Sequence, residues 1–260
     1  MAQAQRPLIY ISYGMRKSGS TLAFEFTRAI LEQNGFRQKR LSPEAVPGDA
    51  SINFVQRLTA AQLERIETEA RALGYPIVLK THLPPTPDVE AWVKAGRAQG
   101  HCVYRDPREM ALSLMDHGRR ARASGARAFS NIHTLDDAVR DIRRQVPHFT
   151  SWVRLPGFIP LYYDDVAFAS QDTIRRLCEQ MGLRADPAKV ERHVKSWRPT
   201  QYNKGVPGRA KEMPPEDAAR VREEFSAFFE EFIDPRPPRT APLQAKPLPL
   251  RRIWSWLRRA

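Results

Sequence analysis

The chain has 260 residues, of which 42% are hydrophobic and 27% are charged. This length suits one large α/β domain, and the composition is typical of a soluble globular protein. No apolar run approaches the roughly 18 residues that a membrane-spanning helix needs, and residues 1–7 lack the apolar core of a secretion signal. We therefore expect a cytoplasmic protein.

The chain is strongly basic. Its 42 Lys and Arg residues exceed its 29 Asp and Glu residues, which gives a net charge of +13. Such a charge attracts nucleic acid, acidic membrane and phosphorylated ligands alike, so it does not choose among them. The two cysteines, Cys102 and Cys178, both lie among apolar neighbours. They predict buried free thiols in a reducing compartment rather than a disulfide.

Taken in chain order, the first element is an apolar run at residues 8–13, which has the β-propensity of a buried strand. A polar loop follows, after which apolar residues within 22–30 recur at the spacing of one helical face. Thr59 and Gln62 form a capping box that opens the next helix, which runs to about Leu73.

The alternation of strands and helices continues downstream. Asp106 and Pro107 suit the N-cap and the first position of a helix after the third strand. The other predicted elements are strands at residues 76–82, 101–105 and 158–163 and helices at residues 88–98, 135–152, 171–182 and 186–197. This order predicts an α/β fold, a P-loop-type parallel β-sheet flanked by helices on both faces, in a single domain over residues 1–233. The proline-rich residues 234–260 predict an irregular tail that ends in a basic, aromatic segment.

Ligands of such folds bind at the carboxyl ends of the strands. The loop after the first strand, from Gly14 to Thr21, reads Gly-Met-Arg-Lys-Ser-Gly-Ser-Thr. Its place between a strand and a helix suits an anion held by backbone N–H groups. It is not a Walker A loop, because Ser20 follows Gly19 where Walker A has its lysine, and the lysine here is Lys17. An ordinary strand-to-helix turn also contains Gly and Ser, so the loop alone leaves that alternative open.

Polar residues also end the second and third strands. His82 has an imidazole that titrates near neutrality and suits a general base, and the Lys80 ammonium can offset charge on a transferring group. Arg105 and Ser113, two turns into the following helix, suit one phosphate together. Taken alone, His82 also fits a strand-end histidine with a local hydrogen bond, and Arg105 fits a surface arginine beside a capped helix.

Taken together and in their order along the chain, the polar segments that end the first three strands resemble those of cytosolic-type sulfotransferases. This family uses 3′-phosphoadenosine-5′-phosphosulfate (PAPS). The resemblance runs from about Ile9 to Arg209. It implies in-line transfer of a sulfuryl group from PAPS to a hydroxyl or amine of an acceptor, without a metal, leaving adenosine 3′,5′-bisphosphate (PAP). It also implies that His82 is the general base and that Lys17 and Lys80 are the other catalytic residues.

The resemblance further implies which residues bind the cofactor. Arg105 and Ser113 correspond to the family's 3′-phosphate site. Tyr163 corresponds to a tyrosine near the adenine, as does the Ser196–Trp197 pair, for which a buried core tryptophan is the alternative. A late loop matches the one that closes over the 3′-phosphate, although Asn203 replaces its first arginine. The implied cofactor-binding residues are Arg16, Lys17, Ser18, Gly19, Ser20, Thr21, Arg105, Ser113, Tyr163, Ser196, Trp197, Asn203, Lys204 and Gly205.

Two other functions fit parts of the sequence. A P-loop kinase that uses ATP and Mg²⁺ needs an acidic metal ligand at a strand end, where Lys80 and Arg105 stand instead. A non-catalytic nucleic-acid-binding protein explains the charge but not the lysine loop or His82, so no nucleic acid is expected as a partner.

Several features stay open at this level. The acceptor is a small molecule or a glycan, and the oligomeric state is not indicated. Residues 250–260 combine tryptophans with arginines, which fits either weak contact with an anionic membrane surface at the inner face or packing on the domain. The arginines from Arg119 to Arg127 fit either an acidic acceptor or a solvated helix face.

Overall fold

The computed structural model describes residues 7–47, 53–197 and 206–236. Within these residues, a four-stranded parallel sheet with the strand order β2-β1-β3-β4 forms the centre of the molecule. The strands are β1 (Ile9–Gly14), β2 (Ile77–Thr81), β3 (Ala98–Tyr104) and β4 (Phe158–Tyr162). The predicted strands and their parallel arrangement are confirmed. The last strand is one residue shorter than predicted because Tyr163 begins a helix.

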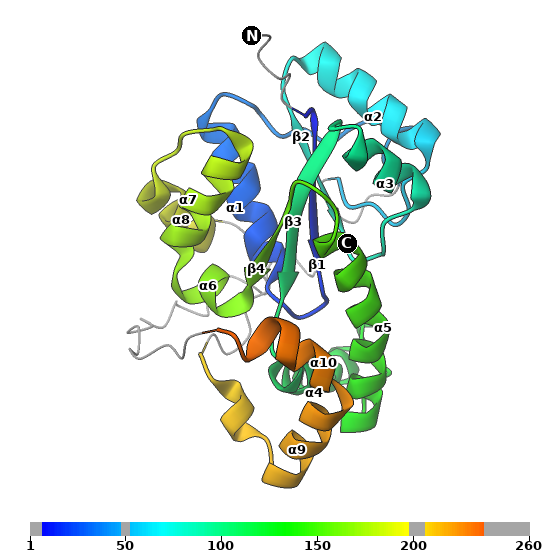
Figure 1. Cartoon of the computed structure of the whole chain (residues 1–260), viewed down its shortest axis with the longest axis vertical. Helices are drawn as coiled ribbons and strands as arrows, with labels where there is room; N and C mark the ends of the chain where they lie inside the picture. The colour runs from blue at the N-terminus through cyan, green and yellow to red at the C-terminus, as the bar shows by residue number, and fades with distance from the viewer. Residues whose placement is uncertain (1–6, 48–52, 198–205, 237–260) are drawn as a thin grey trace.

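Helices cover both faces of the sheet, as Figure 1 shows. One face carries α1 (Ser20–Gln33), α6 (Tyr163–Phe168), α7 (Ser170–Met181) and α8 (Pro187–Trp197). The opposite face carries α2 (Ala60–Leu73), α3 (Pro87–Lys94) and α5 (Leu135–Val153). A third group gathers at the carboxyl ends of the strands, at the bottom of Figure 1: α4 (Pro107–Ser124), η1 (Arg209–Glu212), α9 (Pro215–Glu224), α10 (Ser226–Phe228) and η2 (Phe229–Ile233).

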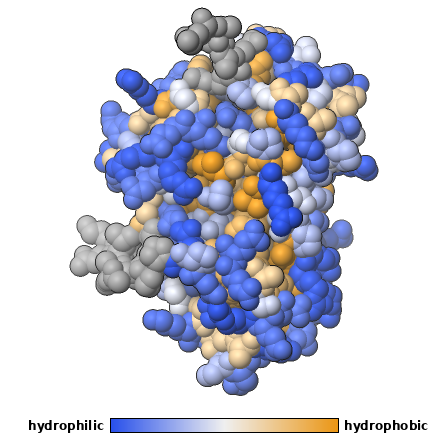
Figure 2. Space-filling view, viewed as in Figure 1, coloured by the Kyte–Doolittle hydropathy of each residue, from blue (hydrophilic) through white to orange (hydrophobic). Residues whose placement is uncertain are grey.

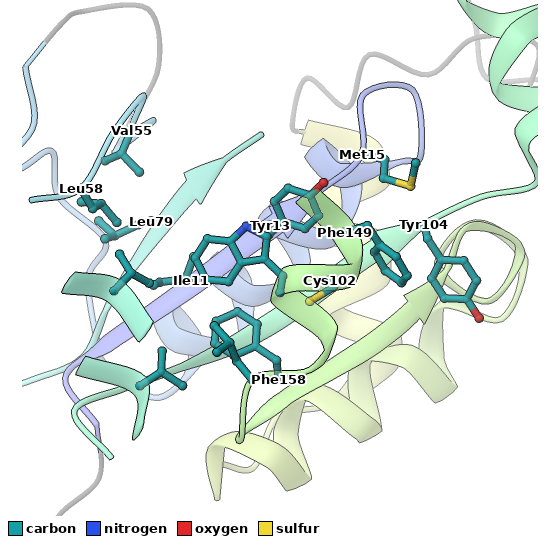
Figure 3. Packing of buried hydrophobic residues seen from close by; sticks show 14 of the residues in the cluster. Ile11, Tyr13, Met15, Val55, Leu58, Leu79, Cys102, Tyr104, Phe149 and Phe158 are labelled. Atoms are coloured by element: carbon teal, nitrogen blue, oxygen red, sulfur yellow. The ribbon is translucent and has the colours of Figure 1, made fainter. Parts of the chain in front are cut away.

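The core divides into two clusters because side chains alternate across the pleated strands. Tyr10 of β1 is buried on the side of α1, whereas Ile11 and Tyr13 are buried on the side of α5. Figure 3 shows Tyr13 near Cys102 of β3 and Ile11 near Leu79 of β2, with Phe149 of α5 in the same cluster. Burial on both faces explains why the strands read as apolar runs. Both cysteines are buried free thiols, as the sequence predicts.

The capping residues predicted from the sequence begin α2 and α4. Thr59 and Gln62 make both hydrogen bonds of the capping box of α2. The Asp106 carboxylate accepts a hydrogen bond from the Arg108 N–H at 2.8 Å, and Pro107 is the first residue of α4. These caps satisfy N–H groups that have no partner within their own helix.

The described surface is mainly polar, and apolar side chains reach it in the middle of the view, between the helical layers (Figure 2). None of the described helices is long and apolar enough to cross a membrane.

Side-chain hydrogen bonds join the residues just after the predicted domain boundary at residue 233 to the domain before it. Both Arg222 Nη atoms donate to the Asp234 carboxylate, at 3.0 and 2.6 Å. Arg236 Nη1 donates to the Tyr104 hydroxyl at 3.0 Å. The described chain is therefore docked on the domain as far as Arg236, a short way past the predicted boundary. The remainder of the predicted tail, including residues 250–260, lies outside the described residues.

Candidate active site

The loop between β1 and α1 is held in shape by buried hydrogen bonds. The Met15 N–H donates to the Val103 carbonyl at 2.9 Å. The Ser18 hydroxyl is fully buried and donates to the Met15 carbonyl at 2.6 Å, with the Val103 carbonyl oxygen 3.2 Å away. The Ser18 side chain therefore stabilises the loop from within. Lys17 adopts φ 69°, a left-handed conformation that is uncommon for a residue with a side chain.

Two glycines allow this loop to approach its neighbours closely. A Cβ atom on Gly14 would lie 2.4 Å from the Cβ of Ser20. Gly19 has φ +84°, and a Cβ atom there would lie 2.8 Å from the Tyr163 ring. Gly19 is also the N-cap of α1, and no described side chain caps this helix. The Leu22 N–H donates to the Gly19 carbonyl at 3.0 Å, so the N–H groups before it, those of Ser20 and Thr21, are the ones without an intrahelical acceptor, an arrangement that suits an anion.

Two lysines lie beside this helix N-terminus. Lys80 Nζ donates to Thr21 Oγ1 at 2.7 Å, and Lys17 Nζ donates to His117 Nδ1 at 3.3 Å. Burial is the main cause that lowers the pKa of each lysine to about 8, and nearby positive side chains such as Arg105 lower the pKa of Lys17 further. Both ammonium groups are poorly solvated, so an incoming anion compensates them strongly.

His82 lies against the start of the loop. Its Nδ1 is 2.6 Å from the Gly14 carbonyl oxygen. Because a carbonyl can only accept, Nδ1 carries the hydrogen and donates, which leaves the lone pair on Nε2. Burial, followed by the charges of Lys80, Arg16 and Lys17, lowers the pKa of His82 to about 4, although the bond to Gly14 opposes this. The imidazole is therefore neutral at physiological pH and holds an unprotonated nitrogen.

Arg105 joins three elements at the end of β3. It is 5% exposed, and its Nη2 and Nε donate to Glu109 Oε2 at 2.8 and 2.9 Å. Its guanidinium carbon lies 3.7 Å from the centre of the Tyr163 ring, and its Nη1 is 3.5 Å from the Lys17 carbonyl oxygen. The pair with Glu109 occupies one side of the guanidinium and leaves further N–H donors for another anion.

Side chains of α5 hold two segments of the site in place through hydrogen bonds. The Arg16 N–H donates to Gln145 Oε1, and Arg16 Nη2 donates to Asp141 Oδ1 at 2.5 Å. Gln145 Nε2 in turn donates to Asp141 Oδ2 at 2.8 Å. The Trp152 indole N–H donates to the Leu83 carbonyl at 2.8 Å. One helix thus anchors both the loop and the segment that follows His82.

The arrangement at the strand ends combines an uncapped helix N-terminus with lysines, an arginine and a neutral imidazole. Residues 10–231 match the family profile described as the sulfotransferase domain. The chain belongs to the sulfotransferase domain family. This assignment confirms the resemblance found in the sequence motifs.

Solved structures agree with this assignment at the level of fold. A retinol dehydratase in complex with androsterone and the inactive cofactor PAP has 16% identity and a TM-score of 0.58, with 90% of this chain and 84% of that chain covered. A mouse sulfotransferase complexed with PAP has 15% identity and a TM-score of 0.56, with 88% and 86% covered. A search of curated protein sequences finds no match.

Most of the predicted site residues come together in this sulfotransferase domain, and some do not. The loop residues, both lysines, His82 and Arg105 are connected by the contacts above. Ser113 is buried on α4, at 2% exposure. Ser196 is exposed near the end of α8, and Trp197 is the last residue of that helix. The three residues of the predicted closing loop lie outside the described part of the chain: Asn203, Lys204 and Gly205.

The sulfotransferase domain also contains residues near the site to which the sequence motifs assigned no role in it. Glu109 pairs with Arg105 at the i,i+4 spacing of a helical ion pair, so a local signal for it existed. Arg209 is 3% exposed and pairs with Asp116 at 2.9 Å, which docks η1 on α4. His117, Asp141 and Gln145 had no local signal for the site, since their partners in the loop, Lys17 and Arg16, are 100 to 129 residues away.

Among the described residues, no group of three or more His, Cys, Asp or Glu side chains lies where it could hold a metal ion.

Proposed function

We propose that this chain transfers a sulfuryl group from PAPS to a hydroxyl or amine of a small-molecule acceptor, with PAP as the other product. The convergence of Lys17, Lys80 and Arg105 on the uncapped N-terminus of α1, beside a neutral His82, carries this proposal. When bound, PAPS supplies the sulfuryl group that moves to the acceptor.

The residues present fit a ligand with phosphate groups at two ends. The N–H groups of α1, with Lys17 and Lys80, suit the 5′-phosphosulfate, and Gly14 and Gly19 let the loop pack closely against Ser20 and Tyr163. Arg105 suits the 3′-phosphate, because Glu109 and Tyr163 hold its planar guanidinium in place. The fixed positive charge of these groups stabilises charge that develops on the leaving phosphate oxygen.

His82 is proposed as the general base. Since its Nδ1–H donates to Gly14, Nε2 is the nitrogen that can take the acceptor proton. A pKa of about 4 makes His82 a weak base in the free site, where burial and the charges of Lys80, Arg16 and Lys17 oppose its protonation. Negative charge placed against those cations is expected to raise the His82 pKa toward its ordinary value of about 6.5, so the base gains strength as the site fills.

Apolar side chains beside His82 support a small organic acceptor. The Phe54 ring centre lies 5.7 Å from the His82 ring centre. Leu83, the next residue, is 39% exposed. Two of the similar structures contain small apolar alcohols, androsterone and retinol, with PAP. By analogy we propose an acceptor of this class, in which an apolar body packs near Phe54 and a hydroxyl reaches His82 Nε2.

The first test is calorimetric titration of the full chain with PAP in EDTA, beside ATP with Mg²⁺. We expect PAP to bind without metal and ATP with Mg²⁺ to bind weakly or not at all. If ATP with Mg²⁺ binds and PAP does not, the proposed sulfuryl transfer would be refuted in favour of a P-loop kinase activity. Salt-sensitive binding of DNA without any binding of PAP would favour the nucleic-acid-binding alternative.

The second test separates the base from the binding site. His82→Asn keeps an N–H donor for the Gly14 carbonyl but has no group that replaces the basic Nε2. We expect turnover with PAPS to fall about 10²–10⁴-fold, as for loss of a general base, with PAP affinity within about threefold of wild type. His82→Ala, which loses the Gly14 bond as well, is the companion variant. Full turnover in His82→Asn would remove the general-base role.

A further inference from the structure

The side chain of Lys17 is held by a histidine on α4. Lys17 Nζ lies 3.3 Å from His117 Nδ1, and Arg120 Nη2 lies 3.4 Å from the same nitrogen. Ammonium and guanidinium groups only donate hydrogen bonds, so Nδ1 acts as an acceptor for both and carries no hydrogen. The proton of this neutral imidazole therefore lies on Nε2. Burial, then the charges of Lys17 and Arg120, lowers the pKa of His117 to about 4, in agreement with a neutral ring.

The imidazole is fixed by the segment that follows α4. Phe129 meets His117 edge-on, with ring centres 4.9 Å apart and an interplanar angle of 84°. The Phe129 ring centre also lies 5.8 Å from Lys17 Nζ, within cation–π range. This segment is tied to α4, because Arg122 Nη1 donates to the Ile132 carbonyl at 2.6 Å.

Gly118, the residue after His117, permits the close packing of this segment. A Cβ atom on Gly118 would lie 2.2 Å from the Ile132 carbonyl oxygen and 3.1 Å from that of Phe129. Any larger residue would push the segment away and with it the aromatic ring that bounds His117. The lysine, the imidazole and the phenyl ring therefore form one packed unit built from three separate segments.

We propose that His117 is a positioning residue for Lys17, and this inference rests on the proposed sulfuryl transfer. A lysine side chain has four rotatable bonds, so fixing it in one orientation costs conformational entropy. The hydrogen bond from Lys17 Nζ to His117 Nδ1 fixes the orientation of the lysine before the ligand binds.

The charge of the group that accepts the Lys17 hydrogen bond matters as much as its position. A carboxylate at this position would also hold Lys17, but it would cancel the positive charge and repel an anionic ligand. A neutral imidazole directs the ammonium and leaves its charge available. The other charged groups around the pair are Asp116 and Arg120 on α4, Arg105 after β3 and Arg16 in the loop. His117 is the neutral hydrogen-bond acceptor among them.

The direct test is NMR of the full-length chain with ¹⁵N-labelled histidine, with the His117 signals assigned by comparison with a His117 variant. We expect the Nε2–H tautomer at pH 7, with a pyridine-type Nδ1. A hydrogen on Nδ1, or an imidazolium ring, would overturn the inference. This measurement requires no activity, so it reports on the contact separately from the proposed function.

The functional test compares three variants. Asn places its amide where Nδ1 lies, whereas Gln places it nearer the position of Nε2 and Leu has no polar group. We expect kcat with PAPS to fall about tenfold or more in His117→Leu and His117→Gln, and to stay within about threefold of wild type in His117→Asn. The melting temperature is expected to change little, which separates positioning from loss of fold.

The outcomes distinguish this inference from the function on which it rests. A wild-type chain that neither binds PAP nor turns over PAPS would refute the proposed function and, with it, the role of His117. Wild-type turnover that is retained in His117→Leu would refute the positioning role alone. Equal losses in the Asn and Leu variants would also refute it, because a general packing role does not depend on an acceptor at Nδ1.

Discussion

Raising the pH from 7 to 9 is expected to weaken PAP binding about 100-fold. Burial is the main cause that lowers the pKa of both Lys17 and Lys80 from 10.5 to about 8 in the free protein. A group with a pKa of 8 is about 90% protonated at pH 7 and about 10% protonated at pH 9. If the complex requires both ammonium groups, the competent fraction of free protein falls from about 80% to about 1%.

The sign of the effect follows from the bound charges. Phosphate groups favour the protonated lysines, so binding draws protons from solution above pH 8 and affinity decreases as pH rises. PAP itself does not titrate in this range, because the second pKa of a phosphate ester is about 6. Lysines with the ordinary pKa of about 10.4 would give almost no change between pH 7 and 9.

Calorimetry at pH 7, 8 and 9 in buffers of different ionisation enthalpy measures both the affinity and the number of protons taken up. The matched variants are Lys17→Arg and Lys80→Arg, because a guanidinium stays charged throughout. Each is expected to reduce the pH effect to about tenfold, the contribution of the one lysine that remains. Wild-type affinity that stays within about threefold from pH 7 to pH 9 would refute the assignment of these lysines to the site.

Three further predictions concern residues of the site and of the central sheet. Arg105→Lys should weaken PAP binding about tenfold or more, because an ammonium cannot both stack on Tyr163 and form the forked pair with Glu109; calorimetry that finds unchanged affinity would exclude Arg105 from the site. Gly19→Ala should lower PAP affinity and the melting temperature, since the left-handed backbone alone costs about 1–2 kcal/mol and its Cβ would lie 2.8 Å from the Tyr163 ring; a variant that melts and binds as wild type does would contradict the close packing. Burial lowers the pKa of His101 to about 3, so the unfolded chain takes up the proton first and stability falls as pH drops from about 6.5 toward 3. Between pH 7 and pH 5, His101 is expected to account for a loss of about 2 kcal/mol in the free energy of unfolding. Urea unfolding of wild type and of His101→Gln at both pH values measures this loss as the difference between the two proteins. Equal pH dependence in the two proteins would refute it.

The sequence predicted the elements whose signals are local. Apolar runs bounded by polar loops identified the four strands, because both faces of a parallel sheet are buried. The capping pattern at Thr59 and Gln62 located the start of α2 because the two residues bond to each other's backbone. The helices after residue 206 were not predicted. Their apolar residues, such as Phe228 and Phe229, are recognisable as core only once they pack at the end of the sheet.

The site divides in the same way. The order of the polar strand ends that hold Lys17, His82 and Arg105 can be read in the amino-acid sequence, and with it the family to which the chain belongs. The contact between Lys17 and His117, the tautomer of His82 and the lowered pKa values of the lysines arise only in the folded chain. These properties depend on distance and burial between segments that are far apart in the chain. Such segments meet only when the strands take the order β2-β1-β3-β4 and the helices close over their ends.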